Sequence, residues 1–352
     1  MNERMKRFHQ YGFPVGVLPT GPRNAISDVA GVLVGHSTRI ENTDTRTGVT
    51  IVDPGTQNLF RDKLPAAVYV GNGFGKMAGT THIEELGTLE TPIALTNTLA
   101  VGPVLRALVD IVIRETKDLT PTETINAVVG ETNDGFLSDI HADSIGKKDV
   151  EEAYRSRSAE FPVGNVGAGT GTRAFAWKGG VGTASRVVSL SGRSYVLGVL
   201  VQTNFGGSLR ILGAPIGESL GASDFRDLVK RPDGSCMIVV ATDAPLTARQ
   251  LKRVAKRAFF GIIRTGSIAA HGSGDYALAF SIDRSGIEGA GNVGNCLPDA
   301  VLDAFFLAAA DATEEAVYDA LFAAETMTGR EGNTLQALPK EEVLEYLKTV
   351  AS

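Results

Sequence analysis

Apolar residues recur at two spacings along this chain, and each spacing predicts a different kind of element. A return every three or four residues gives a helix one buried face. This spacing predicts helices at 101–115, 247–264, 297–310, 314–325 and 341–350. Short apolar or alternating runs bounded by turn residues predict strands instead. Strands are predicted at 49–52, 66–70, 93–96, 127–130, 187–190, 195–201, 237–241 and 276–282, with a turn and a further strand within 24–36.

The boundary between the helices at 297–310 and 314–325 is placed at Thr313, a residue type that caps helix N-termini. Its capping box is incomplete, because Ala316 stands where Glu or Gln is wanted. Helices and strands do not alternate strictly over the whole chain. This order favours a layered α+β fold over a doubly wound parallel sheet.

The segment 207–235 has the composition of an exposed linker. It holds several glycines, Pro215 and a charged run at 224–230, and exposed loops of this kind are where chains are processed. The strands before and after it are strongly apolar. We therefore expect one domain over 1–352, with a single core and a cut in it.

Composition narrows the range of functions. Apolar residues make up 43% of the 352 residues, the net charge is −6, and basic residues are scattered without interleaved aromatics, so nucleic-acid binding is not expected. No apolar stretch approaches the length that spans a bilayer, so no membrane partner is expected. The first seven residues are polar with no apolar segment behind them, which predicts a cytoplasmic protein without a secretory signal.

Several motifs in the chain suggest cofactors only superficially. The loop GNGFGK at 71–76 lacks the first glycine and the Ser or Thr of a phosphate-binding loop, and GAGTG at 167–171 lacks the spacing of a dinucleotide fingerprint. The five histidines and two cysteines show no metal-ligand spacing, and no GxSxG elbow is present. No cofactor and no metal are expected.

The pair Gly234-Ser235 carries the most specific chemistry in the chain. It lies at the mouth of an apolar strand, behind a turn-prone stretch. The Ser235 hydroxyl could attack the Gly234 carbonyl, move the chain to an ester and let water cut it. Ser235 would then own a free α-amine, which can act as the base for its own hydroxyl. Cys236 is the rival nucleophile, but its side chain should face away from that of Ser235 and be buried.

Eight segments, taken in chain order, carry a resemblance to a known family. They are NAISDVAGVLVGH at 24–36, NGFGK at 72–76, ETNDG at 131–135, GNVGAGTGT at 164–172, KGGVGTASR at 178–186, VQTNFG at 201–206, GSCMIVVATDAPL at 234–246 and RTGSIAAHGSGDYALAFS at 264–281. Together they resemble the L-aminopeptidase D-amidase/D-esterase (DmpA-like) family, which includes the β-peptidyl aminopeptidases. The resemblance implies a four-layer α/β/β/α sandwich of N-terminal-nucleophile type. It also implies self-cleavage into 1–234 and 235–352, and a homo-oligomer of the two-fragment unit.

The same resemblance assigns catalytic roles to four residues. Ser235 matches the nucleophile, with the cut between Gly234 and Ser235. Asn204 in VQTNFG matches the amide that stabilises the oxyanion, where a fixed donor is needed as negative charge builds up. Ser273 and Asp275 match a Ser-x-acid pair that holds the nucleophile and its amine; some relatives carry Glu in place of Asp275.

Two further residues are assigned to substrate binding by the resemblance. Glu131 in ETNDG matches a carboxylate that binds the substrate's free amine. Asn133 stands where relatives can carry a Tyr whose hydroxyl helps the oxyanion, so either its amide substitutes or that contribution is missing.

The function expected from all of this is a self-processing serine aminopeptidase or amidase that acts on small peptides, amides or esters. Three alternatives stay open at this point. The first two, of similar fold, are an amide-oligomer hydrolase and an acyltransferase that passes the acyl group to an amine. The third is a relative without activity that binds small amines, and the intact Gly234-Ser235 pair argues against it.

Overall fold

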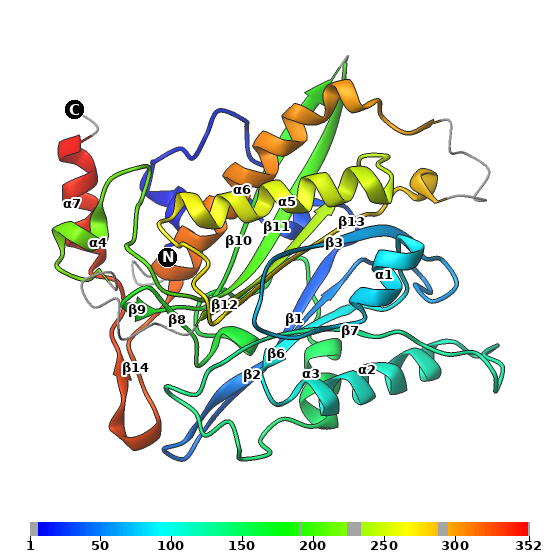
Figure 1. Ribbon diagram of the computed structural model, residues 1–352, viewed down its shortest axis with the longest axis horizontal. Coiled ribbons are helices and arrows are strands. Elements are labelled where there is room, and N and C mark those ends of the chain that lie inside the picture. The colour runs from blue at the N-terminus through cyan, green and yellow to red at the C-terminus, as the bar shows by residue number, and fades with distance from the viewer. Residues whose placement is uncertain (1–5, 191, 224–233, 288–294, 351–352) are drawn as a thin grey trace.

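Two stacked β-sheets form the centre of the molecule in the computed structural model, which describes residues 6–190, 192–223, 234–287 and 295–350 (Figure 1). The larger sheet has the strand order β10-β11-β12-β13-β3-β5. Its strands are β10 (Val181–Leu190), β11 (Arg193–Asn204), β12 (Gly234–Thr242), β13 (Ser273–Ser281), β3 (Leu64–Gly73) and β5 (Thr88–Leu89). Only β12 and β13 pair in parallel; the other neighbours are antiparallel.

The second sheet has the order β1-β2-β6-β7-β4, with β6 and β7 as its parallel pair. Its strands are β1 (Leu33–Glu41), β2 (Thr45–Asp53), β6 (Ile93–Asn97), β7 (Val128–Thr132) and β4 (Met77–Ala78). Two short pairs lie outside both sheets: β8 (Arg173–Ala174) with β9 (Trp177–Lys178), and β14 (Met327–Thr328) with β15 (Thr334–Leu335).

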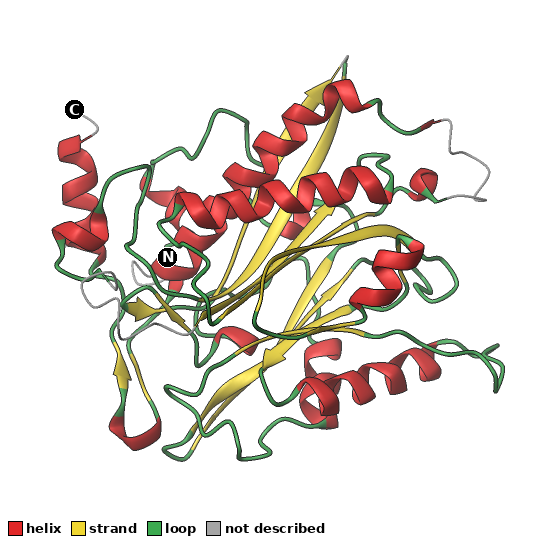
Figure 2. Cartoon of the chain, viewed as in Figure 1, coloured by secondary structure: helices red, strands yellow, loops and turns green. Residues whose placement is uncertain are grey.

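Helices cover the outer face of each sheet, which gives the layer order helix, sheet, sheet, helix (Figure 2). α5 (Ala248–Arg264) and α6 (Leu302–Ala323) lie on the larger sheet, and α2 (Val101–Glu115) and α3 (Lys147–Arg155) lie on the smaller one. The remaining helices are α1 (Thr80–Leu86), α4 (Ile216–Ser219) and α7 (Lys340–Val350). The predicted four-layer α/β/β/α sandwich is confirmed.

Three apolar clusters fill the spaces between these layers. One lies between the larger sheet and α5 with α6, one between the two sheets, and one between the smaller sheet and α2 with α3. The sheets approach very closely where β7 crosses β12: a Cβ on Gly130 would lie 2.8 Å from the sulfur of Met237. Glycine at this point therefore permits the close contact of the sheets just below the ends of β7 and β12.

Most predicted elements are present, and the strands are longer than predicted. The helix predicted at 101–115 coincides with α2, and the helix predicted at 247–264 is α5 with Thr247 as its N-cap. Thr247 and Gln250 form a capping box there. The strand predicted at 237–241 extends back to Gly234, because its first residues pair with β11 and β13.

One predicted boundary is wrong. Instead of two helices separated at Thr313, a single helix, α6, runs from Leu302 to Ala323. Thr313 is buried inside it, and its hydroxyl donates to the carbonyl of Ala309 (2.7 Å) rather than capping a helix end. No Gly or Pro interrupts the chain here, so the helix continues through the polar residues.

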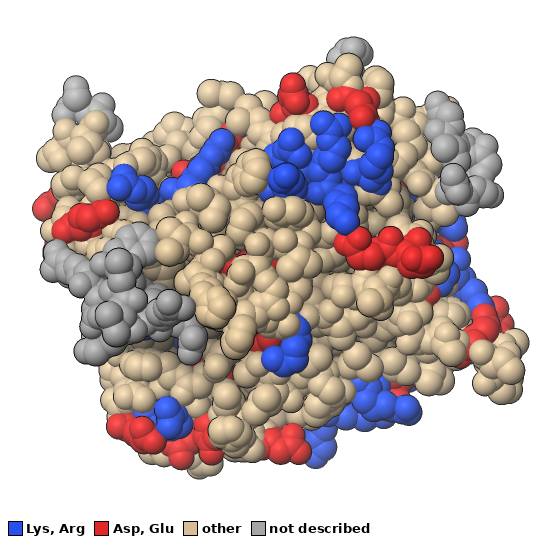
Figure 3. Space-filling model, in the orientation of Figure 1, with Lys and Arg blue, Asp and Glu red and all other residues tan. Residues whose placement is uncertain are grey.

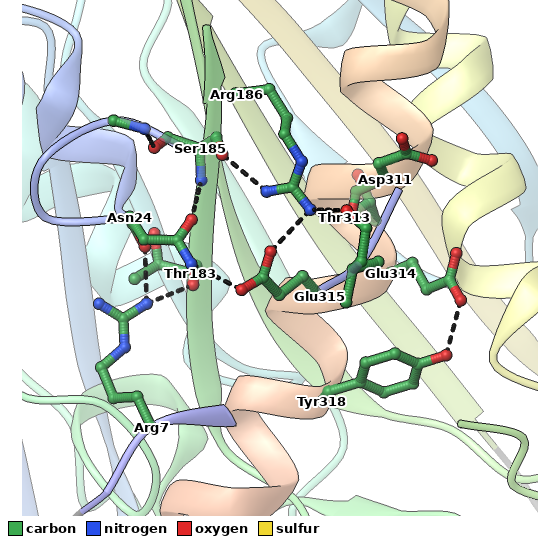
Figure 4. A network of polar contacts seen from close by, with 12 residues as sticks. Arg7, Asn24, Thr183, Ser185, Arg186, Asp311, Thr313, Glu314, Glu315 and Tyr318 are labelled. Carbon is green, nitrogen blue, oxygen red and sulfur yellow. Dashed lines mark hydrogen bonds and ion pairs between the residues drawn. The ribbon is translucent and has the colours of Figure 1, made fainter. Parts of the chain in front are cut away.

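The acidic residues of α6 are balanced by partners from other elements (Figure 4). Arg186 of β10 reaches Glu315 at 2.6 Å, and Glu315 also accepts from Asn24 at 2.6 Å. Glu314 pairs with Arg264 of α5 at 3.4 Å. Long-range ion pairs therefore compensate the polar residues that sequence periodicity treated as a break.

The predicted exposed linker is only partly exposed. Gly207 to Leu209 are buried, and Ile216 and Gly217 of the short α4 are buried too. The charged run at 224–230 lies outside the described residues. Gly234, which ends the linker, is buried at the start of β12.

Basic side chains that recur at helical spacing between residues 249 and 257 gather on the outer face of α5 (Figure 3). Lys252 pairs with Glu84 at 2.7 Å, and Arg253 pairs with Asp299 at 3.2 Å while lying over the ring of Phe306. These ion pairs neutralise part of the group. Within the described residues, no helix has the length and apolar character needed to cross a membrane.

Candidate active site

Ser235 lies at the beginning of β12, a central strand of the larger sheet. It is the second residue of β12, it is 4% exposed, and its hydroxyl donates to the carbonyl of Gly234 at 2.6 Å. Met237, two residues further along, packs between the two sheets. Because side chains alternate along a strand, Ser235 faces this inter-sheet space as well.

Cys236 faces the opposite side, as predicted. It belongs to the apolar cluster between the larger sheet and the helices α5 and α6. Burial, together with the nearby charge of Asp275, raises the pKa of its thiol well above the usual value. The thiol stays protonated in this environment, which suits a structural residue rather than a nucleophile.

Asn204 stands directly opposite Ser235 in the antiparallel ladder of β11 and β12. Its side-chain amide is held at both ends. Oδ1 accepts from the backbone N–H of Arg173 at 3.0 Å, and Nδ2 donates to the carbonyl of Asn133 at 3.0 Å. Since Nδ2 carries two hydrogens, one N–H is left to donate to another acceptor.

Ser273 and Asp275 begin β13, the parallel neighbour of β12. The Ser273 hydroxyl donates to Asp275 Oδ1 at 2.9 Å, so the predicted pair is formed. The register sets Ser273 against Gly234 and Asp275 against Cys236, so both side chains point to the face opposite Ser235. A Cβ on Gly234 would lie 3.2 Å from the Ser273 oxygen. Ser273 therefore lies against the backbone of Gly234 and is bonded to Asp275, and neither side chain faces the Ser235 hydroxyl.

The carboxyl of Asp275 is electrostatically unusual. It is 1% exposed, and within the described part of the chain its Oδ2 has no hydrogen-bond partner. Burial raises its pKa to about 6, although the hydrogen bond from Ser273 opposes the rise. A buried acceptor atom is thus left open on the carboxyl that is bonded to Ser273.

Glu131 lies at the end of β7 and is 2% exposed. Its Oε1 accepts from the backbone N–H of Lys76 at 2.9 Å and from the Lys76 ammonium at 3.2 Å. A Cβ on Gly75 would lie 3.4 Å from Oε1 and 2.9 Å from the Cα of Gly274, which is the β13 neighbour of Ser235. The loop around Gly75 therefore links this carboxylate to β13 at the position next to Ser235.

Asn133 is exposed, and its side chain is used within its own turn. Oδ1 accepts from the N–H of Gly135 at 2.9 Å, and the carbonyl of Asn133 accepts from Asn204. Its clearest contact with the other site residues is therefore made by the backbone. A direct contact of its amide with substrate stays a prediction.

A cavity of about 460 Å³ opens next to Asn204. Its lining includes the apolar side chains Phe136 and Phe205 and the guanidinium groups Arg173 and Arg330, together with Asn133 and Asn204. Arg330 is held by the carbonyl of Gly135 at 3.2 Å. The volume suits a small ligand with an apolar body and polar ends.

Three buried polar residues near the site were not predicted from the sequence. Gln202 donates to Thr132 at 2.8 Å and to the carbonyls of Thr96 and Ala168, which ties β11 to the other sheet. Asp134 and Lys178 are both buried beside the loops that hold Asn204. A usable signal existed, since each lies inside or beside a matched segment and Lys178 is a lone charge among apolar and glycine residues.

Among the residues that the structure describes, no group of three or more His, Cys, Asp or Glu side chains is placed to hold a metal ion. The site instead presents a hydroxyl, an oriented amide and two buried carboxyls. The four-layer sandwich has the architecture of the N-terminal-nucleophile hydrolases, and it places a strand-end hydroxyl opposite a fixed amide donor.

The chain belongs to Peptidase family S58, whose model matches residues 24–335. It is 40% identical to the β-peptidyl aminopeptidase BapA of Sphingosinicella microcystinivorans, over 97% of this chain and 92% of that protein. Two solved structures are similar over 98% of this chain and 99% of theirs. They are the PH0078 protein from Pyrococcus horikoshii OT3 (41% identity, TM-score 0.90) and the L-aminopeptidase D-Ala-esterase/amidase from Ochrobactrum anthropi (36% identity, TM-score 0.88). The latter is described as a variant of the Ntn-hydrolase fold. The family and these neighbours support aminopeptidase or amidase function.

Proposed function

We propose that this chain is a self-processing serine aminopeptidase or amidase in which Ser235 is the nucleophile. It releases the N-terminal residue of small peptides, amides or esters. The observation that carries the proposal is the Asn204 amide, fixed at both ends and placed opposite Ser235 on the same face of the sheet. Such a preorganised donor is what a developing oxyanion requires.

The first step is self-cleavage. The Ser235 oxygen attacks the Gly234 carbonyl carbon, the C–N bond to Ser235 breaks, and an ester forms while the hydroxyl proton passes to the released amine. Water then hydrolyses the ester, which gives Gly234 a carboxylate and leaves Ser235 with its hydroxyl and a free α-amine. In the uncut chain the two groups are already adjacent, with the hydroxyl 2.6 Å from the Gly234 carbonyl oxygen.

Turnover uses the amine that self-cleavage creates. An α-amine has a reference pKa near ~7.7–8.0, which suits a base at neutral pH. It accepts the Ser235 proton as the oxygen attacks the substrate carbonyl, and Asn204 donates to the oxyanion. The protonated amine then supplies the proton for the leaving group, and water activated by the same amine hydrolyses the acyl-enzyme. Asp275 Oδ2, a buried acceptor linked to Gly234 through Ser273, would stabilise the ammonium form.

Glu131 would bind the free amine of the substrate. Its Oε1 is engaged by Lys76, whereas no described residue donates to Oε2. A buried carboxylate with one open oxygen suits an ammonium and rejects an acetylated amine, because the neutral amide would leave it without a charged partner. The cavity beside Asn204, which Phe136 and Arg330 help to line, would receive the leaving group.

The two fragments would remain one folded unit after the cut. β12 and β13 belong to 235–352, yet they lie between β11 and β3, which belong to 1–234. Separation would break two strand ladders in the middle of a sheet. Assembly of this unit into a homo-oligomer stays a prediction.

The decisive experiment combines mass spectrometry of the purified protein with paired substrates. We expect two masses that correspond to 1–234 and 235–352, and turnover of small free-amine amides but not of their N-acetylated forms. Glu131→Gln should raise KM for free-amine substrates while self-cleavage continues, since the precursor has no such amine at the cut. Glu90→Gln is the matched control, because Glu90 is equally buried, also has a Lys partner (Lys63) and lies outside the site.

A single intact mass in fully active protein would contradict the amine mechanism. Equal rates on free and acetylated substrates would contradict the role of Glu131 and favour a general amidase. Transfer of the acyl group to an added amine in preference to water would instead identify an acyltransferase.

A further inference from the structure

Lys178 is a fully buried basic residue that the proposed reaction does not use. Its ammonium donates to the carbonyls of Gly169 and Gly179, both at 2.9 Å, and the residue is 0% exposed. Burial lowers its pKa to about 7, while Asp134 opposes the decrease. A charge placed away from water is costly unless it is paired, so its contacts define what it can do.

These contacts close the loop formed by residues 170–178, which lies next to Asn204. Gly169 precedes the loop and Gly179 follows it, so Lys178 joins the two ends at its base. The N–H of Gly179 strengthens this closure by donating to the carbonyl of Thr172 at 3.0 Å. Within the loop, the backbone N–H of Arg173 donates to Asn204 Oδ1. Lys178 thus braces the segment that holds the oxygen end of the Asn204 amide.

Asp134 belongs to the second loop, which accepts the hydrogen bond from the nitrogen of the Asn204 amide. It directly follows Asn133, whose carbonyl accepts from Asn204 Nδ2. The Asp134 carbonyl accepts from the N–H groups of Leu137 and Ser138, at 3.1 and 3.0 Å, which folds this segment into a turn. Its side chain is buried, and in the described part of the chain Oδ1 has no hydrogen-bond partner.

Asp134 also lies against the loop that Lys178 closes, since a Cβ on Gly171 would lie 2.9 Å from the Cβ of Asp134. Burial raises the pKa of Asp134 to about 7; a hydrogen bond from Thr47 and the charge of Lys178 oppose the rise, and the charge of Glu131 adds to it. Among the described residues Asp134 and Lys178 make no direct ion pair, and Lys178 reaches backbone carbonyls instead. Packing at Gly171, rather than a direct ion pair, therefore joins the two loops.

We propose that Asp134 and Lys178 are positioning residues that together fix the orientation of the Asn204 amide. Asp134 secures the loop that accepts from the amide nitrogen, and Lys178 secures the loop that donates to the amide oxygen. This inference rests on the proposed oxyanion role of Asn204. Misplacing a reacting group by about 1 Å can cost up to about 10²-fold in rate, so loss of either residue should lower kcat by roughly 10- to 10²-fold with little change in KM.

The test is a double-mutant cycle with Asn204. Lys178→Met and Asp134→Asn are made alone and in the Asn204→Ala background, and the self-cleavage rate, kcat and KM are measured for each. Asn204→Ala alone should cost on the order of 10²–10³ in kcat. If the pair acts through Asn204, neither substitution should cost anything further in that background. The double variant Asp134→Asn with Lys178→Met should be no slower than the slower single variant.

Arg186→Met is the matched control, because Arg186 is also a fully buried basic residue but is paired with Glu315 far from the site. It should lower the melting temperature and leave kcat unchanged. If Lys178→Met does not fold, the neutral isostere Asp134→Asn carries the test alone. Unchanged kcat in the single variants, or equal losses with and without Asn204, would overturn the positioning role. A normal Asn204→Ala enzyme would overturn the oxyanion assignment instead.

Discussion

Replacing Asp275 by Asn in the uncut Ser235→Ala chain should remove a specific pH dependence of stability. The carboxyl is buried, its Oδ2 has no partner among the described residues, and its pKa is raised to about 6 from a reference of 3.8. The folded chain therefore holds the proton more tightly than the unfolded chain does. The stability that this group contributes is fully present below pH 4 and is lost as the pH rises through about 6.

The magnitude follows from the size of the shift. A difference of about two pKa units, at ~1.4 kcal/mol per unit, corresponds to about 3 kcal/mol between pH 4 and pH 7. Many other carboxyls titrate over the same range, so the useful quantity is the difference between Ser235→Ala and the Ser235→Ala, Asp275→Asn double variant. Asn is neutral throughout, so the double variant should gain about 3 kcal/mol relative to its parent as the pH rises.

Urea unfolding followed by the fluorescence of Trp177, the only tryptophan and a buried one, measures both stabilities at each pH. A constant difference between pH 4 and pH 7 would refute the burial argument. In the cut wild-type enzyme the new ammonium of Ser235 should stabilise the carboxylate and lower the pKa of Asp275, so the pH dependence should shrink or reverse. If cut and uncut chains behaved alike, Asp275 would not serve the amine.

Three further outcomes are expected. Ser235→Ala should give one uncut and inactive chain by mass spectrometry and peptide hydrolysis, whereas Cys236→Ala should still be cut and remain active; an inactive but folded Cys236→Ala would identify the wrong nucleophile. The cut fragments 1–234 and 235–352 should elute together in native gel filtration and separate only in denaturant, and separate native elution would contradict a shared sheet. Prolonged chelation should leave activity intact, and a loss restored by one metal would show that the site contains a metal.

The sequence determined the local elements and the list of candidate residues. Periodicity placed α2 at its observed bounds, and the turn before the apolar run at 237–241 located Gly234 and Ser235 at a strand mouth. It failed at α6, where polar residues indicated a break at Thr313. The reason is that ion pairs from Arg186 and hydrogen bonds from Asn24, distant in the sequence, compensate the polar positions of a buried helix.

Only the tertiary structure decided how the candidates are arranged. The ladder register set Asn204 opposite Ser235 but turned Asp275 to the other face, because a shift of one position along a strand reverses the side chain. The two loops that fix the Asn204 amide, and the buried Asp134 and Lys178 behind them, depend on carbonyl contacts that no residue pattern encodes. Local chemistry is written in the order of residues, whereas orientation and electrostatic environment arise only when segments far apart in the chain pack together.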